Sequence, residues 1–483
     1  MMLTGLLIAP VVTAVPLAFY GHRRFAPYVN MAGSAAAFLF SVGLAWQVFD
    51  QGPIQTSGGS FFVDAFNVFL AVLTAFVSMT TAAFSRPYMA HEFKQGRVGP
   101  RRMRLYHAMF QLFIFAMLLA LLTNNMGILW IAMELATLAT VLLVSLYRTP
   151  ESVEAAWKYF ILCGVGIAQA LFGTTLLYFA AERVLGEGGT TLHWTNLNAA
   201  ASSLEPTILS LAFVFFLAGY GAKVGLVPLH NWLPDAHSEG PTPISAVLSG
   251  LLLNVALYAV VRCKVLVDGA TGTNRAGQLM MAMGLLSLVV AAFALFLQRD
   301  VKRMFSYSSI EHMGIMAFAF GLGGKLATFA ALLHMLVHSL VKSSIFFTVG
   351  HASHMHGTQQ MDRIQGIIRG NPLVGWGLVV GVMAIAGLPP FGIFVSEFLI
   401  LTATMREAPF LAPILLLGLA VAFAGLLRKV QPMVFGAPPA HQVPVRAAHV
   451  PVILHLVIAL VLGLFIPSFL SQWFETAVSM MRW

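Results

Sequence analysis

Apolar segments of about 20 residues, joined by short polar connections, recur along the whole chain. An α-helix of this length crosses the hydrocarbon core of a bilayer, so each segment predicts a membrane span. We expect about 14 spans, which makes the chain an all-α polytopic membrane protein without a separate soluble domain. The expected spans are centred near residues 10, 38, 72, 113, 135, 168, 217, 254, 287, 313, 338, 382 (continuing through 398), 420 and 462.

Two of the expected spans are interrupted by clustered prolines. The stretch GYGAKVGLVPLHNWLPDAHSEGPTPIS covers residues 219–245, and AIAGLPPFGIFVSEFLI covers residues 384–400. Proline removes a backbone donor and breaks or kinks a helix, so we expect neither stretch to form one straight helix. The prolines concerned are Pro228, Pro234, Pro241 and Pro243 in the first stretch and Pro389 and Pro390 in the second.

A broken backbone survives at membrane depth only where protein or a water-filled cavity satisfies its freed polar groups. Near the first break, His230, Asp235, His237 and Glu239 are expected to supply that polar lining. One break in each half is typical of transporters built from two inverted repeats. We therefore expect a single integral membrane domain over residues 1–483. Its expected parts are N-terminal helices (about 1–104), a first repeat (about 105–265), a second repeat (about 277–430) and a C-terminal helix (about 450–475).

Composition agrees with a membrane protein, because 9% of the residues are charged, compared with about a quarter in soluble domains. The net charge of +9 comes largely from basic connections such as residues 86–104, so nucleic-acid binding is not expected. With the N-terminus placed outside, 18 of the 27 Lys and Arg residues fall on the cytoplasmic side. The positive-inside rule then predicts a multi-pass protein of a bacterial or archaeal cytoplasmic membrane with both termini outside.

The sequence contains no ligand pattern for a redox cofactor. Cys163 and Cys263 stand a hundred positions apart without a CxxC pair, so they cannot hold an iron–sulfur cluster. A group of three histidines has no acid or cysteine close by in the sequence to complete a metal site. These histidines are His351, His354 and His356. We expect no cofactor and no metal on this chain, and redox chemistry only on partner proteins.

Ionisable side chains inside the expected spans are the functional candidates, because each costs about 2.5 to 3.5 kcal/mol near the bilayer centre. Glu134 in GILWIAMELATLATVLLV has no charged neighbour within a turn, so its partner is expected on another span, and Lys223 is the candidate. One interpretation is a static buried ion pair. The other is a titratable pair, because a desolvated lysine releases its proton more readily than one in water.

A second candidate is the ordered set His334, His338 and Lys342. A spacing of four residues places the three side chains on one face of one helix. A single buried histidine is more often a packing residue, but the ordered set favours a proton path. Glu397, just after the second break, is a further charged group within an expected span.

Four long motifs resemble those of one membrane-protein superfamily. They are GAKVGLVPLHNWLPDAHSEGPTPISAVLSG, MELATLATVLLVSLYRTPESVEAAWKYFILCG, RDVKRMFSYSSIEHMG and AGLPPFGIFVSEF. Over nearly its whole length the chain resembles the proton-translocating antiporter-like subunits of respiratory complex I. That superfamily also includes multisubunit sodium/proton antiporters and membrane-bound hydrogenases, and the branch of hydrogenase-4 component F is the most similar.

The resemblance implies a role in proton translocation for six residues, namely Glu134, Lys223, His334, His338, Lys342 and Glu397. It makes Glu134 the acid of the fifth helix, Lys223 the lysine of the broken seventh helix and Glu397 the exit group of the broken twelfth helix. Many relatives have a lysine or histidine in the eighth helix, where this chain has Asn254. Asparagine cannot carry a proton, so water or His338 would have to bridge the path there.

Together these features predict a subunit that moves protons across the membrane while a partner protein carries out redox chemistry. Other membrane and peripheral subunits of a multisubunit redox complex are the expected partners, with the lipid bilayer and protons. Two alternatives stay open. The first is a sodium/proton antiporter without redox input, which would need grouped carboxylates or carbonyls to dehydrate sodium. The second is a structural scaffold whose charged groups only pair helices.

Overall fold

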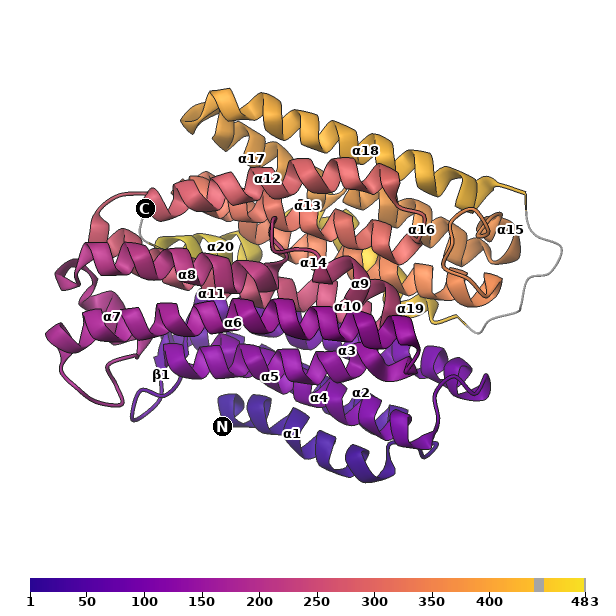
Figure 1. Cartoon of the computed structure of the whole chain (residues 1–483), viewed down its shortest axis with the longest axis horizontal. Helices are drawn as coiled ribbons and strands as arrows, with labels where there is room; N and C mark the ends of the chain where they lie inside the picture. Colours follow the sequence, from indigo (N-terminus) through magenta and orange to yellow (C-terminus); the bar gives the residue numbers. More distant parts are fainter. Residues whose placement is uncertain (438–446, 482–483) are drawn as a thin grey trace.

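The computed structural model describes residues 1–437 and 447–481 of the chain, and nearly all of this part is helical. Most helices run side by side along the long axis of the molecule (Figure 1). Among the described residues, 11 helices are long and apolar enough to cross a membrane, or 12 if a bent C-terminal pair forms one span. The all-α polytopic fold is therefore confirmed, whereas the expected count of about 14 spans is not.

The two expected spans outside that count have physical explanations. α13 (Val301–Leu322) contains Lys302, Arg303, Glu311 and His312, so its hydropathy is too low for a span identified by composition. The span expected near residue 382 is divided into α16 (Pro372–Ile385) and α17 (Gly392–Glu407), of 14 and 16 residues. A helix lies at each of the expected centres. α13 does not have the composition of an isolated span, and α16 and α17 do not have the length of one.

The first half of the chain consists mainly of long helices, with one small two-stranded sheet. Two short strands, β1 (Ile54–Gln55) and β2 (Phe62–Val63), pair antiparallel with Ile54 opposite Val63. The helices are α1 (Met2–Tyr20), α2 (Ala26–Gln51), α3 (Ala65–Lys94), α4 (Pro100–Leu122), α5 (Met126–Val144), α6 (Pro150–Leu185), α7 (Trp194–Ala199) and α8 (Pro206–Val224).

The second half begins with short helices and ends with the bent pair. A five-residue π-helical segment (Leu248–Leu252) joins α10 to α11. The helices, besides α13, α16 and α17, are α9 (Trp232–Glu239), α10 (Thr242–Val247), α11 (Leu253–Thr271), α12 (Arg275–Leu297), α14 (Gly324–His356), α15 (Ile367–Gly370), α18 (Ala412–Phe435), α19 (His449–Leu464) and α20 (Ser468–Ser479). The inverted relation between the two halves stays a prediction.

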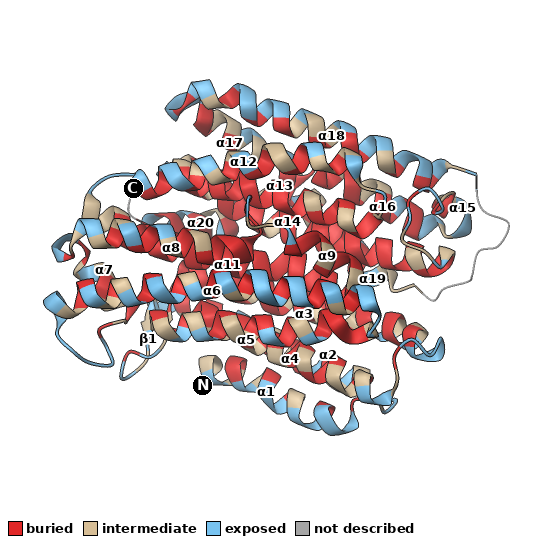
Figure 2. Ribbon diagram, in the orientation of Figure 1, coloured by how far each residue is buried: buried red, intermediate tan, exposed pale blue. Residues whose placement is uncertain are grey.

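Burial separates an inner group of helices from an outer layer. Buried residues concentrate on α10, α11, α13 and α14 in the centre, while α1, α6 and α18 carry many exposed residues on the outside (Figure 2). The apolar stretch within residues 242–271 is entirely buried, as expected for a helix that is hydrophobic all round. The central ionisable side chains of these helices are therefore shielded by protein, where charged groups in membrane proteins are tolerated; they are Glu311, His312, His334, His338 and Lys342.

Candidate functional site

The first predicted break is present within residues 219–245. α8 ends at Val224, directly after Lys223, and the chain becomes helical again at Trp232. Gly225 at the end of α8 is left-handed, with φ +80°, a conformation that glycine adopts without a steric penalty. Lys223 thus lies in the last turn of a helix that stops inside the protein.

Side chains satisfy backbone groups that the first break frees. The indole N–H of Trp232 donates to the carbonyl of Ala222 at 2.8 Å. The backbone N–H of Val227 donates to the hydroxyl of Ser287 on α12 at 2.9 Å, just before Pro228, whose preceding peptide bond is cis. Protein groups therefore replace the lost helical hydrogen bonds, which is the condition for irregular backbone at membrane depth.

Lys223 is completely buried, and its ammonium group has no hydrogen-bond partner among the described residues. It lies 5.7 Å from the ring centre of Tyr159. Glu134 on α5 is half-buried, and its Oε2 also lacks a partner among these residues. The two side chains interact electrostatically but form neither a hydrogen bond nor a close ion pair. The structure therefore brings the predicted partners near each other without closing the contact.

The four polar residues expected around the first break do not form one lining. Asp235 lies toward the surface, where it forms ion pairs with Lys158 (3.3 Å) and Arg303. His230 is half-buried beside Tyr307, with ring centres 6.2 Å apart. Asp235 therefore fastens α9 to α6 and α13, and the structure does not place it in the expected polar lining, because its carboxylate pairs with two cations toward the surface.

His237 and Glu239 occupy different surroundings from Asp235. His237 is completely buried, stacks on Phe346 with ring centres 5.2 Å apart, and has no hydrogen-bond partner for either ring nitrogen among the described residues. Glu239 accepts a hydrogen bond from the hydroxyl of Ser238 and lines a cavity near the end of α9. Of the four, His237 is the one placed in the buried centre of the molecule.

Asn254 on α11 forms a neutral bridge to α14. Its side-chain amide donates to the hydroxyl of Ser339 at 2.8 Å and to the carbonyls of Met335 and Gly250 at 3.3 Å. The Ser339 hydroxyl donates in turn to the Gly250 carbonyl at 2.6 Å. An amide held in this way orients neighbouring groups, but it offers no site that a proton can occupy.

Lys342 lies in the buried centre, between α13 and α14. Its ammonium group donates to the carbonyl of Phe305 at 2.9 Å. Glu311 on α13 interacts electrostatically with Lys342, is 3% exposed, and has one carboxylate oxygen without a partner among the described residues. His338, one turn before Lys342 on the same helix, also interacts with it. A buried lysine therefore has an acid and an imidazole as neighbours.

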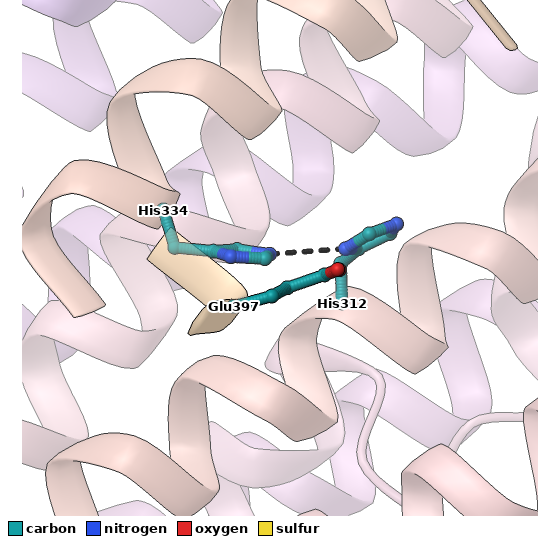
Figure 3. A group of neighbouring side chains, drawn as sticks. All are labelled: His312, His334 and Glu397. Atoms are coloured by element: carbon teal, nitrogen blue, oxygen red, sulfur yellow. Dashed lines mark hydrogen bonds between the residues drawn. The ribbon is translucent and has the colours of Figure 1, made fainter. Parts of the chain in front are cut away.

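Beyond Lys342 and His338 lies a group of two imidazoles and one carboxylate, those of His312, His334 and Glu397 (Figure 3). Nδ1 of His312 and Nε2 of His334 are hydrogen-bonded at 3.0 Å, and Nδ1 of His334 is hydrogen-bonded to the Ser396 hydroxyl at 2.9 Å. The ring of His338 lies 5.4 Å from that of His312. The carboxylate of Glu397 points toward the two linked rings, and the three residues offer ligand-type atoms within 4.8 Å of one another.

A donor set of two histidines and one glutamate also occurs in zinc sites. Here the two imidazoles already share a hydrogen bond, and Ser396 holds the second nitrogen of His334. These contacts form a short hydrogen-bonded chain from His312 through His334 to Ser396. We use the name polar axis for a set of nine residues, all buried except the half-buried Glu397. The set is Lys223, Asn254, Ser339, Lys342, Glu311, His338, His312, His334 and Glu397.

The second predicted break also lies at this end of the polar axis. α16 ends at Ile385, Gly387 is left-handed with φ +68°, and α17 begins at Gly392, so the helix is interrupted within residues 384–400 as predicted. Pro389 and Pro390, joined by a cis peptide bond, occupy the turn. Because Glu397 follows in the first turns of α17, the break delivers its carboxylate to His312 and His334.

Sequence reasoning missed Glu311 and His312, which the structure places in the centre of the polar axis. Both stand in the run SSIEHMGIMAFAF, and two ionisable residues followed by an apolar stretch were a signal that could have found them.

The statement that no acid lies close to His354 holds along the sequence but is wrong in three dimensions. Glu92 of α3 approaches His354 to 2.5 Å, although the two are 262 positions apart.

Comparison with known sequences supports the resemblance of the motifs. Residues 123–424 match the family described as NADH:quinone oxidoreductase/Mrp antiporter, transmembrane. The chain is 48% identical over 471 residues to the hydrogenase-4 component F homolog of Methylacidiphilum infernorum, covering 98% of both chains. It is 31% identical over 365 residues to NADH-quinone oxidoreductase subunit N of Desulforudis audaxviator, covering 74% of this chain and 69% of that protein.

Solved structures share the fold over almost the entire chain. A chain of the membrane-bound sulfane sulfur reductase, an archaeal respiratory membrane complex, superposes with a TM-score of 0.89 at 25% identity, covering 99% of this chain and 97% of the other. A chain of respiratory complex I from Thermus thermophilus gives a TM-score of 0.84 at 20% identity, covering 100% and 99%. A chain of the Mrp complex from Dietzia sp. DQ12-45-1b gives 0.86 at 19% identity, covering 99% and 97%.

Proposed function

The chain belongs to the NADH:quinone oxidoreductase/Mrp antiporter transmembrane family, and from this premise we propose that it is a proton-translocating membrane subunit of a redox-driven complex. The observation that carries the proposal is the polar axis, because so many ionisable side chains are buried in a helical membrane protein only where they serve transport or pair with one another. The relatives include subunits of respiratory membrane complexes, which supports other membrane and peripheral subunits as its partners.

The polar axis supports proton transfer in steps between neighbouring groups. Lys223 and Lys342 are each buried near an acid, which stabilises the protonated amine. Asn254 and Ser339, hydrogen-bonded to each other at 2.8 Å, hold no proton, so water must carry the proton between the two lysines. From Lys342 the imidazoles of His338, His312 and His334 lead to Glu397, the proposed exit group.

The free energy gained when the open Glu134–Lys223 pair closes is large enough for the pair to act as a switch. Moving one proton against about 150 mV requires about 3.5 kcal/mol. Bringing two unit charges to about 4 Å at an effective dielectric constant near 20 is worth about 4 kcal/mol. Closing the pair would therefore hold a proton on Lys223, and opening it would release the proton toward the polar axis. The arrangement observed here corresponds to the open state.

The fold also supports the proposed orientation in a bacterial or archaeal cytoplasmic membrane. The start of α1 and the end of α20 lie toward the same end of the bundle, while the connection between α3 and α4 lies at the opposite end (Figure 1). That connection contains basic residues over 94–104, so the positive-inside rule places it in the cytoplasm and both termini outside.

The proposed function is tested by Lys223→Ala in the complex purified with its redox partners and reconstituted in proteoliposomes. We expect electron transfer to continue while the proton-to-electron ratio falls, because Lys223 is the fully buried amine beside Glu134. Lys325→Ala is the matched control, since Lys325 is an exposed lysine at the start of α14 and should leave the ratio unchanged.

Three results from the reconstituted complex and its variants would contradict the proposal. An unchanged ratio in Lys223→Ala would exclude the polar axis as the proton path. Transport that requires sodium and proceeds without a redox reaction would favour a sodium/proton antiporter. Full activity after neutralising both Glu134 and Lys223 would favour a scaffold in which these charges only pair helices.

A further inference from the structure

A cavity of about 470 Å³ lies at the end of the molecule where α3 and α14 finish, away from the polar axis. Its wall comes from four parts of the chain, with Tyr88 and Glu92 on α3, Glu239 and Thr242 around the start of α10, and Ser353 and His354 on α14. Exposed residues at its rim, among them Arg97 and Thr149, show that it reaches the surface. The cavity lies on the same side of the molecule as the basic connection between α3 and α4, to which Arg97 belongs.

The inner wall of this cavity holds a buried acid–imidazole pair. Oε1 of Glu92 lies 2.5 Å from Nε2 of His354, and the side chains are 1% and 3% exposed. Oε2 of Glu92 and Nδ1 of His354 have no hydrogen-bond partner among the described residues. The imidazole is held in place by stacking on Tyr88, with ring centres 4.2 Å apart. Each member of the pair thus has one buried polar atom without a hydrogen-bond partner among the described residues.

Buried charged groups continue from the pair toward Lys342. Lys302 is 1% exposed, donates to the carbonyl of Gly240 at 2.6 Å, and interacts electrostatically with Glu92 and Glu239. His237 is buried within electrostatic range of both Lys302 and Lys342. The groups between the cavity and the polar axis therefore form a second line of proton-accepting side chains, which approaches the axis at its central lysine.

We propose that Glu92 and His354 are the residues through which protons from the cavity enter the protein, passing by Lys302 and His237 to Lys342. This inference rests on the proposed function of the polar axis. In each step one proton leaves a donor and joins the neighbouring acceptor: from cavity water to the Glu92–His354 pair, then to neutral Lys302, then through His237 to neutral Lys342. No other bond is made or broken.

A purely structural role would explain the same contact, because the pair also fastens α3 to α14. The substitution Glu92→Gln separates the two roles, since glutamine keeps the size and the hydrogen-bonding capacity toward His354 but cannot take up a proton. We expect proton translocation by the reconstituted complex to slow by at least about tenfold, as for loss of a proton-transfer group, with an unchanged melting temperature.

Glu154→Gln is the control for Glu92→Gln. Glu154 is an exposed acid at the start of α6, paired with Lys158, and its replacement should leave the rate unchanged. If Glu92→Gln translocates protons at the wild-type rate while Lys223→Ala loses proton translocation, the inlet proposal is overturned and the proposed function is left intact. Wild-type pumping in both variants would refute the proposed function itself.

A second experiment examines the cavity without changing the pair. The native cysteines are both buried, so Thr358→Cys introduces one accessible thiol at the cavity wall, where Thr358 is partly exposed. We expect a membrane-impermeant thiol reagent to label it only from the side of the basic connections and to slow pumping. Gln360→Cys, exposed outside the cavity, should be labelled without slowing. Absence of labelling at position 358, or labelling without slowing of proton translocation, would overturn the inlet.

Discussion

Replacing Lys342 with methionine is expected to lower proton translocation by at least about tenfold while electron transfer by the partner subunits continues. Methionine fills a similar volume but carries no proton. Lys342 is completely buried, and it lies where the proposed inlet and the two halves of the polar axis meet. The measurement is the proton-to-electron ratio of the reconstituted complex, compared with its rate of electron transfer in detergent.

Lys429→Met provides the matched control for Lys342→Met. Lys429 on α18 also donates to a backbone carbonyl, that of Gln298 at 3.0 Å, but it lies outside the polar axis. Loss of such a hydrogen bond to a charged group costs about 1.5–3 kcal/mol in either variant, so a similar change in melting temperature is expected. If both variants pump alike, Lys342 contributes packing rather than proton transfer.

The substitution Asp64→Ala is expected to destabilise the protein more than any surface change. The carboxylate is 1% exposed, and its Oδ2 accepts a hydrogen bond from Nη2 of Arg262 at 2.6 Å. Its Oδ1 accepts from the backbone N–H groups of Phe66 and Asn67 and so caps α3. Removing one partner of a buried ion pair costs about 3–5 kcal/mol, and loss of a helix cap adds about 1 kcal/mol.

Thermal unfolding in detergent measures this effect, with Asp50→Ala as the control at an exposed acid near the end of α2. We expect a clear fall in melting temperature for Asp64→Ala and little change for the control. Asp64→Asn should lie between them, because the amide oxygen can still cap α3 while the charge of Arg262 stays unpaired. A melting temperature of Asp64→Ala equal to that of the control would show that the pair contributes little to stability.

Both functional breaks were predictable because their causes are local. Prolines and glycines act on the backbone of their own segment, so residues 219–245 and 384–400 could be identified as interrupted without any tertiary contact. The same holds for the apolar spans, whose length alone decides whether they can cross a bilayer. The count of about 14 is not confirmed, because α13 carries charged residues that lower its hydropathy below that of a span identified by composition.

The candidate site was only partly predictable. Lys223, His334, His338 and Lys342 stand out in the sequence because ionisable residues are rare in apolar runs. Glu92 gave no such signal, because it follows Tyr88 and His91 near the polar end of its helix, where charged residues are typical of a surface position. Its burial depends on α14, which covers the end of α3 and brings His354 to its carboxylate.

By itself, then, the sequence determined the membrane class, the helical segments, the two breaks and most of the ionisable residues, because each depends on the chemistry of neighbouring residues along the chain. The tertiary structure alone decided which of these side chains meet. In a helix that is apolar on every face, periodicity does not reveal which face lies inside. Contacts such as Asp64–Arg262, Glu92–His354 and His312–His334 exist only because packing brings distant helices together.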